Sequence, residues 1–323
     1  MRAFSLTDEL IDRRTFGQHF GLIIIFGLLV LGLTLLSDRF LTLANLTNIL
    51  RQTAINSIIS AGMTLVILTG GIDLSVGSVL ALSVTIGAVL MKQGWPVEIS
   101  VLAALATGAS LGCINGVLIT LARIPPFITT LGMLTMARGL TLMYTQGQPI
   151  TGFPATFRWL GTGDVAEIPV PIVLMLLVFV AGGFFLYRTS FGMQIYLLGD
   201  NPTAARLTGV PVNRLTVLVY TISGFCAALA GLILIARLDS AQPTIGLGYE
   251  LNAIAAVVVG GTGFSGGEGG LVGTLLGALL IETLNNGLNL LNVSPLWEQV
   301  VKGVVIALAL LLYRLISRTA QST

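Results

Sequence analysis

Long apolar runs occupy most of this chain and predict helices that cross a membrane. A helix needs about 20 residues to span about 30 Å of hydrocarbon. A shorter run at 250–264 ends in glycines, so we expect a broken or re-entrant segment there, buried by its neighbours. Nine further runs are candidate spans, at 20–36, 54–72, 76–91, 99–122, 127–144, 168–187, 215–236, 269–291 and 297–315.

This pattern predicts an all-α polytopic membrane protein with about ten transmembrane helices, some of them short or broken. The spans leave no room for a soluble domain, so we expect a single transmembrane domain at 20–315. The segment 1–19 precedes it and the tail 316–323 follows it. The longest polar intervals within the domain are 145–167 and 188–214.

Composition supports a membrane protein and excludes several kinds of chemistry. Only 9% of the 323 residues are charged and 54% are hydrophobic, whereas a soluble domain carries about 25% charged residues. One histidine and two cysteines make a His/Cys metal site improbable, and no cofactor is implied. The chain has no GxxxxGK[ST] loop, so we expect no ATP hydrolysis by this chain itself. It has no basic domain for nucleic acid.

The positive-inside rule gives the orientation. With ten spans and both termini in the cytoplasm, five cations fall outside: Arg39, Arg51, Lys92, Arg158 and Arg237. Nine fall inside: Arg2, Arg13, Arg14, Arg123, Arg188, Arg206, Arg214, Arg314 and Arg318. Arg138 and Lys302 lie within spans and are not counted. The prediction requires that 250–264 crosses the membrane.

A glycine-rich segment joins the second and third apolar runs. Asp73 and Ser75 can cap the helix that follows, and glycine permits tight turns. The segment is either a capped interhelical turn or a broken helix at the transport path or its gate, and the two interpretations are compatible. The candidate gate residues are Gly70, Gly71, Asp73, Ser75 and Gly77.

A second stretch, 260–267, resembles 70–77. When the two are aligned without an offset, two opening glycines, a serine and a closing glycine agree. Such similarity hints at two related halves, a frequent plan in transporters.

Polar residues inside apolar runs are costly in lipid and face the protein interior. The spacing of four such residues in 269–291 places them on one helical stripe. This stripe either lines a hydrophilic passage or bonds neighbouring helices together, and we favour the passage. The candidate path residues are Asn115, Glu282, Asn285, Asn286 and Asn289.

The polar interval 188–214 predicts a short cytoplasmic helix. Asn201 or Asp200 can cap it, Pro202 suits its first turn, and Gly209 ends it. It either docks on another protein or lies as an amphipathic loop helix at the interface. The candidate docking residues are Asn201, Ala204, Ala205, Arg206 and Gly209.

Taken together, several motifs resemble the membrane-spanning permease subunits of bacterial ABC importers for monosaccharides. The resemblance runs from about 40 to 315. Its motifs are Gly62–Ile67, Gly70–Ser78, Pro126–Gly132, Arg188-Thr189 with Phe191-Gly192, Asn201 with Ala204–Arg206, and Ala255–Val258 with Gly260–Thr262. Within this family, the chain most resembles the members that carry ribose. The residues concerned are Leu238 with Ser240–Thr244, Gly248–Leu251 and Asn285–Leu291.

The resemblance implies a dimer of this chain in the bacterial inner membrane, with a periplasmic sugar-binding protein and a cytoplasmic ABC ATPase as partners. It implies that 188–214 carries the helix that docks on the ATPase, which favours docking over an interfacial loop. It implies transport of a monosaccharide, with ribose the best candidate. The alternative from another class is an ion-coupled secondary transporter of a small polar solute, and a purely structural membrane subunit is a third.

Overall fold

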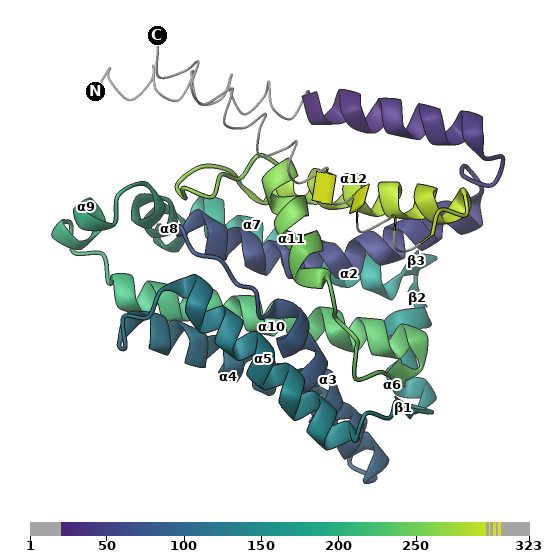
Figure 1. Cartoon of the computed structure of the whole chain (residues 1–323), viewed down its shortest axis with the longest axis horizontal. Helices are drawn as coiled ribbons and strands as arrows, with labels where there is room; N and C mark the ends of the chain where they lie inside the picture. The colour runs from purple at the N-terminus through teal and green to yellow at the C-terminus, as the bar shows by residue number, and fades with distance from the viewer. Residues whose placement is uncertain (1–20, 295–296, 298–299, 302, 305–323) are drawn as a thin grey trace.

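The computed structural model describes residues 21–294, 297, 300–301 and 303–304 (Figure 1). The described chain is mostly helical. Its helices are Gly21–Leu36, α2 (Leu43–Leu68), α3 (Val76–Lys92), α4 (Val97–Thr120), α5 (Pro126–Thr145), α6 (Ala155–Thr162), α7 (Val170–Arg188), α8 (Ser190–Asp200), α9 (Pro202–Leu207), α10 (Val212–Leu238), α11 (Tyr249–Val259) and α12 (Leu271–Leu290).

Each predicted apolar run from 20–36 to 269–291 overlaps one of these helices, whereas 297–315 lies almost entirely outside the described residues. The segments 1–19 and 316–323 lie outside them as well. Within the described part, α4, α7, α10 and α12 are long and apolar enough to cross a membrane by length and composition. The protein is therefore a helical, multi-pass membrane protein.

The helix α2 begins eleven residues before the predicted run, which starts at 54. The apolar pattern did not reveal these first turns because they carry several polar side chains. Thr42 caps this helix, and its hydroxyl accepts a hydrogen bond from the Asn45 amide (3.4 Å). The first turns of α2 thus extend the helix beyond the apolar run.

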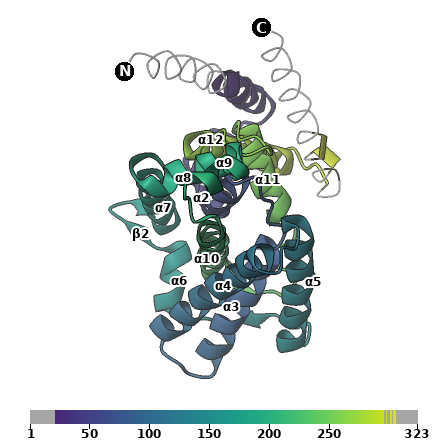
Figure 2. The ribbon, with the colours of Figure 1, turned by 90° about the vertical axis from the view of Figure 1, so that its left-hand side faces the viewer.

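The helix α10 lies at the centre of the bundle, between α4 on one side and α2 on the other (Figure 2). Glycines spaced by four residues, Gly108, Gly112 and Gly116, face α10 along α4. A Cβ atom at Gly112 would overlap the carbonyl oxygen of Tyr220, and one at Gly108 would overlap that of Gly224. Small residues at this spacing let two membrane helices approach closely.

Two short antiparallel pairs lie at the end of the molecule opposite α9 (Figure 1). The strand β1 (Ile150–Thr151) pairs with β4 (Ser240–Ala241), and β2 (Asp164–Val165) pairs with β3 (Ile168–Pro169). The strands β1 and β2 and the helix α6 belong to the polar interval 145–167, β3 follows that interval directly, and β4 lies in the loop after α10.

The short run predicted at 250–264 is a broken segment. Its helix, α11, has 11 residues, about 17 Å at 1.5 Å per residue, which is too short to span the hydrocarbon alone. The non-helical chain before it is buried at Pro243, Ile245 and Gly246. Irregular backbone at this depth is tolerated only inside protein.

Candidate functional site

The predicted cytoplasmic helix exists as α9, and its cap is the predicted one. The Asn201 side chain accepts hydrogen bonds from the amides of Thr203 (3.1 Å) and Ala204 (2.9 Å). Gly209 follows the helix with φ +84°, a conformation that favours glycine. Capping and termination of α9 are therefore local properties of the sequence.

The side chains of α9 divide into an inner and an outer face. Ala205 is fully buried within this chain, so it cannot belong to an exposed docking face as the sequence led us to expect. Arg206 is exposed, and Leu207 is 84% exposed. The outward surface of α9 thus includes the charged and apolar side chains that follow Ala205, together with the exposed Pro202 and Thr203.

A glycine junction, formed by Leu68, Gly199, Gly266 and Gly267, connects α8 to the ends of two other segments. The amide of Gly267 donates to the carbonyl of Leu68 (3.0 Å). A Cβ atom at Gly199 would overlap both that carbonyl and the Gly267 nitrogen. The last turn of α8 therefore sits directly against the end of α2 and the glycine-rich loop before α12.

Tyrosines fix the same loop from the side of α7 and α8. The hydroxyl of Tyr196 donates to the carbonyl of Gly269 (2.8 Å). The hydroxyl oxygen of Tyr187 accepts a hydrogen bond from the Leu271 amide (3.0 Å). Burial raises the pKa of Tyr196 above its ordinary value, and the neighbouring Tyr187 raises it further. Tyr196 thus stays protonated and keeps its donor over the physiological range.

The two glycine-rich stretches predicted to resemble each other do so with an offset of one residue. Gly70 (φ +76°) and Gly261 (φ +91°) each follow the end of a helix. The next residue of each stretch bonds back to the helix: Gly71 to the Val66 carbonyl, and Thr262 to the Val257 carbonyl. These are matching helix ends, so the serine match in our ungapped alignment is wrong.

The turn after α2 contains a buried hydrogen-bonded group, which we call the Asp73 cluster: Asp73, Ser75, Asn115 and Ser223. One carboxyl oxygen of Asp73 accepts from the amide (2.9 Å) and hydroxyl (2.6 Å) of Ser75. The other accepts from the hydroxyl of Ser223 (2.9 Å). Asn115 donates its amide to the Ser75 hydroxyl (2.9 Å). All four residues are at most 1% exposed.

This cluster changes two expectations. Ser75 occupies the N-cap position of α3, but its side chain makes no cap hydrogen bond and turns to Asp73 instead. Asn115, predicted on the path, belongs with the turn and not with the α12 stripe. The cluster ties α3, α4 and α10 to the turn that follows α2.

Glycines allow the same turn to pack. A Cβ atom at Gly71 would meet the hydroxyl of Tyr220 at 2.5 Å. A Cβ atom at Gly77 would overlap the carbonyl of Gly246, in the irregular segment before α11. The start of α3 and the segment before α11 are thus in backbone contact.

Arg138 holds this contact together, a role that its position inside an apolar run does not reveal. Its guanidinium donates to the carbonyls of Pro243 and Ile245, each at 2.8 Å. Broken backbone leaves carbonyls without helical partners, and Arg138 satisfies two of them.

The predicted stripe on α12 faces α2. Glu282 accepts a hydrogen bond from the Asn56 amide (2.9 Å). Asn286 and Asn45 exchange hydrogen bonds of 2.8 and 3.0 Å. Asn285 is buried, whereas Asn289 is exposed at the end of the row. The stripe therefore has features of both proposed roles. Its members bond to a neighbouring helix, as a helix contact would, and the row reaches the surface at one end, as a passage would.

The structure adds a matching polar face on α2 that the sequence analysis missed. Asn56, Ser60 and Thr64 recur every four positions along this face, which is the signal that could have revealed it. Thr64 bonds to Thr274 of α12 (2.7 Å). We call this contact the α2–α12 seam; its polar members are Asn45, Asn56, Ser57, Ser60 and Thr64 of α2 and Thr274, Glu282, Asn285 and Asn286 of α12.

The seam is incompletely hydrogen-bonded. Within the described residues, the side-chain oxygens of Asn56, Ser57, Ser60 and Asn285 are buried without a hydrogen-bond partner. Buried polar atoms are normally satisfied. The seam can therefore accept hydrogen bonds from a polar solute that enters it.

The described residues contain no group of three His, Cys, Asp or Glu side chains that could hold a metal ion. Asp73 and Glu282, the two carboxyl groups buried in the bundle, take part in different hydrogen-bonded groups. The arrangement is one of hydroxyl and amide groups, which suits recognition of a neutral polar molecule.

Comparison with known proteins gives the family. Residues 45–310 match the family described as "Branched-chain amino acid transport system / permease component". The chain is 50% identical over 280 residues to the ribose import permease protein RbsC of Escherichia coli (strain K12), covering 85% of this chain and 87% of that protein. It is 50% identical over 300 residues to RbsC of Bacillus subtilis (strain 168), covering 92% of each.

A more distant relative is the D-allose transport system permease protein AlsC of Escherichia coli (strain K12), 39% identical over 305 residues and covering 94% of each chain. No solved structure matches the chain significantly. These matches confirm the predicted resemblance to sugar import permeases. The chain belongs to the branched-chain amino acid transport system permease component family.

Proposed function

We propose that this chain is the permease subunit of an ATP-driven ABC importer that carries ribose across the bacterial inner membrane. The observation that carries the proposal is the 50% identity to ribose import permeases of two distant bacteria over most of each chain. The identity falls to 39% for an allose permease and 36% for a fructose permease.

We place the sugar path along the α2–α12 seam. Ribose is neutral and carries several hydroxyl groups, and the seam offers buried oxygens that lack partners within the described residues. Leaving such an oxygen unsatisfied costs about 1–3 kcal/mol, so a passing hydroxyl donor would be attracted there. Asn289 would then lie at one mouth of the path, because it is the exposed member of the row.

The proposed topology has ten spans with both termini in the cytoplasm. The cations assigned to each side gather in separate places, which supports it. Arg123, Arg206 and Arg214 surround one pocket. On the other side, Arg51 pairs with Asp164 (3.2 Å) at the end where the short strands lie.

Movement of the ATPase would be coupled to the membrane helices through α9 and the glycine junction. We propose that the exposed face of α9, with Arg206 and Leu207, docks on a cytoplasmic ABC ATPase. The buried Ala205 and the close contact at Gly199 would pass movement of that helix to the end of α2 and the loop before α12. ATP hydrolysis would then belong to the ATPase, because this chain has no phosphate-binding loop.

The remaining partners follow from the same proposal. Two copies of this chain would form the transmembrane core, and a periplasmic sugar-binding protein would deliver ribose to it. The bilayer surrounds the exposed apolar faces. No cofactor, metal or nucleic acid has a part in this scheme.

Reconstitution tests the proposal. The chain would be placed in vesicles with its ATPase and binding protein, and uptake of labelled ribose, xylose, allose and fructose would be measured. We expect uptake that requires ATP and favours ribose. Ribose uptake that needs no ATP and stops when an ionophore collapses the ion gradient would establish the ion-coupled alternative. No uptake of any sugar, with intact assembly, would favour a structural subunit.

A further inference from the structure

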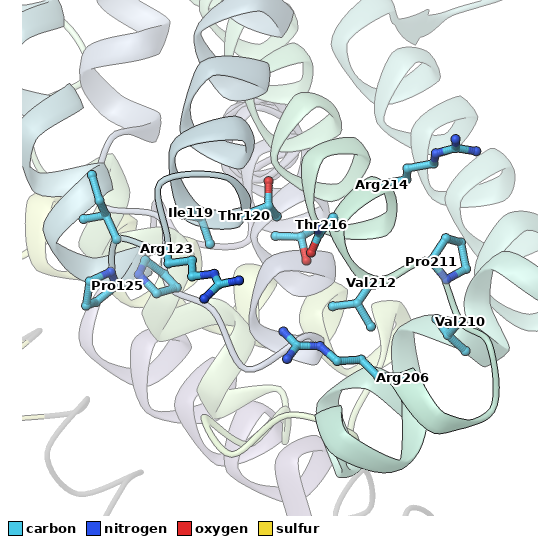
Figure 3. A pocket seen from close by; sticks show the side chains of 13 residues that line it. Ile119, Thr120, Arg123, Pro125, Arg206, Val210, Pro211, Val212, Arg214 and Thr216 are labelled. Atoms are coloured by element: carbon cyan, nitrogen blue, oxygen red, sulfur yellow. The ribbon is translucent and has the colours of Figure 1, made fainter.

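A pocket of about 880 Å³ opens at the α9 end of the molecule. It is formed by the turn between α4 and α5, by α9 and by the start of α10. Three exposed arginines line it: Arg123, Arg206 and Arg214. Figure 3 shows the guanidinium groups of Arg123 and Arg206 reaching toward each other across the pocket, while Arg214 lies further along α10.

No carboxylate lines this pocket. In the part of the chain that the structure describes, the ion pairs are Arg51–Asp164 and Arg158–Asp239, neither of which involves the pocket. Arginines held close together repel one another unless an anion lies between them. The guanidinium fork is suited to phosphate, which it binds with two parallel hydrogen bonds.

Two long helices also begin at the pocket. Pro125 and Pro126, at the start of α5, and Pro211 and Val212, at the start of α10, line it. Neither helix start is capped by a side chain. The amino ends of helices carry partial positive charge, which adds to the field of the arginines.

An apolar groove continues from the pocket along the lipid-facing side of α4 and α10. It has a volume of about 460 Å³ and shares Thr120, Asn213 and Arg214 with the pocket. Apart from Thr221, its other walls are apolar, with Leu121 (71% exposed) and Leu218 (47% exposed) among them. A cationic pocket joined to an apolar groove matches a molecule with a phosphate head and a hydrocarbon tail.

We propose that this pocket binds an anionic phospholipid of the cytoplasmic leaflet. The headgroup phosphate lies between Arg123 and Arg206, and an acyl chain lies in the groove between α4 and α10. Basic pockets between membrane helices on the cytoplasmic side are suited to such headgroups. The choice of leaflet rests on the topology proposed above; the lipid chemistry rests on the pocket alone. Because Arg206 belongs to α9, the lipid would hold this helix against the bundle.

Native mass spectrometry of the purified permease, without ATPase or sugar, tests this site independently of transport. Phosphatidylglycerol, phosphatidylcholine or inorganic phosphate would be added, and bound adducts counted. We expect phosphatidylglycerol adducts to exceed phosphatidylcholine adducts. The double variant Arg123→Gln/Arg206→Gln should lose about tenfold or more of the bound phosphatidylglycerol, since each basic residue near an anionic surface contributes about a factor of five. Arg188→Gln, which removes a cation outside the pocket, should retain it.

The groove distinguishes a lipid from a free anion. Leu218→Trp should obstruct the groove and lower lipid binding, whereas Leu118→Trp, on α4 outside the groove, should not. Equal lipid binding by the double variant and the unchanged protein would overturn the site. Displacement of the lipid by inorganic phosphate, with no effect of Leu218→Trp, would show a free-anion site and overturn the lipid assignment. Loss of the adduct whenever the ATPase is bound would show that the docked ATPase displaces the lipid from Arg206, and would overturn the role of the lipid in holding α9.

Discussion

The Asp73 cluster and the α2–α12 seam are both polar groups inside an apolar bundle, yet they differ in completeness. In the cluster, both oxygens of Asp73 accept hydrogen bonds, and every member is at most 1% exposed. In the seam, Glu282 and Asn286 are bonded while Asn285 and two serines of α2 present oxygens without partners in the described chain. Within the described residues, the cluster leaves one side-chain oxygen without a partner, that of Asn115, whereas the seam leaves four, those of Asn56, Ser57, Ser60 and Asn285.

This difference separates two uses of polarity in a membrane protein. A network built around a carboxylate whose two oxygens are both bonded fixes the relative positions of helices, because breaking a bond to the carboxylate leaves a buried group unsatisfied. An incomplete one costs stability in the resting protein, and that cost is recovered only when a solute binds. This difference supports our proposal that the seam is the solute path and that the Asp73 cluster holds the helices in place.

The largest expected effect comes from Asp73→Ala. It removes three hydrogen bonds at once and leaves Ser75 and Ser223 without their acceptor, so we expect a loss of about 3 kcal/mol or more in the free energy of unfolding. Thermal unfolding of the detergent-purified protein measures it. Asp164→Ala, at an exposed ion pair with Arg51, should cost less than about 1 kcal/mol. Equal shifts for the two variants would mean that the cluster contributes no special stability.

The cluster also shows why prediction from sequence has a limit. Asp73 and Ser223 are separated by 150 positions, and Asn56 and Glu282 by 226. No local pattern pairs them, because their meeting depends on how α10 and α12 return through the bundle. For the same reason, the role of Arg138 as a donor to broken backbone was not predictable.

Local features were predicted far better. The apolar runs gave the helices, since each span must be about 20 apolar residues long. The cap at Asn201 and the ending at Gly209 were correct, because both depend on adjacent residues. The direction in which Ala205 points was not predictable, since it is set by contact of α9 with the rest of the chain.

A matched pair of serine variants sharpens the comparison. Ser223→Ala removes a bonded hydroxyl from the cluster, and we expect a loss of about 1–2 kcal/mol in the free energy of unfolding. Ser60→Ala removes a side-chain oxygen that has no partner within the described residues, and should be neutral or stabilising by up to about 1 kcal/mol. Both would be followed by thermal unfolding.

Ribose uptake by the same two variants should show the opposite order of effects, with the larger effect from Ser60→Ala. Ser60→Ala should lower the apparent affinity for ribose in vesicles, because it removes a hydrogen-bonding group from the proposed path. Properly folded Ser223→Ala, compared at a temperature well below its unfolding, should keep the apparent affinity unchanged. If Ser60→Ala destabilises the protein and leaves ribose affinity intact, the seam is a structural contact like the cluster.

A small effect on stability is also expected from Glu282→Gln. Glutamine keeps an oxygen that can accept the hydrogen bond from Asn56, so unfolding should shift by less than about 1 kcal/mol. Transport separates the two candidate functions, since a proton-coupled carrier would need the carboxyl group whereas a sugar path needs only a polar side chain. We expect ATP-driven ribose uptake to persist. Its abolition in a stably folded variant would revive the ion-coupled alternative.

Accessibility of the row on α12 gives a test that requires almost no change in stability. With Cys113 and Cys226 replaced, single cysteines at Asn285, Asn289 and Leu284 would be treated with a water-soluble thiol reagent during turnover. We expect Asn289→Cys to react first, because that position is exposed. Asn285→Cys should react only in a state that opens the seam, since the side chain there is buried. Leu284→Cys, on another face of the helix, is the control and should stay unlabelled. Labelling of Leu284→Cys alone would place the aqueous path on the wrong side of α12 and contradict our assignment of the seam.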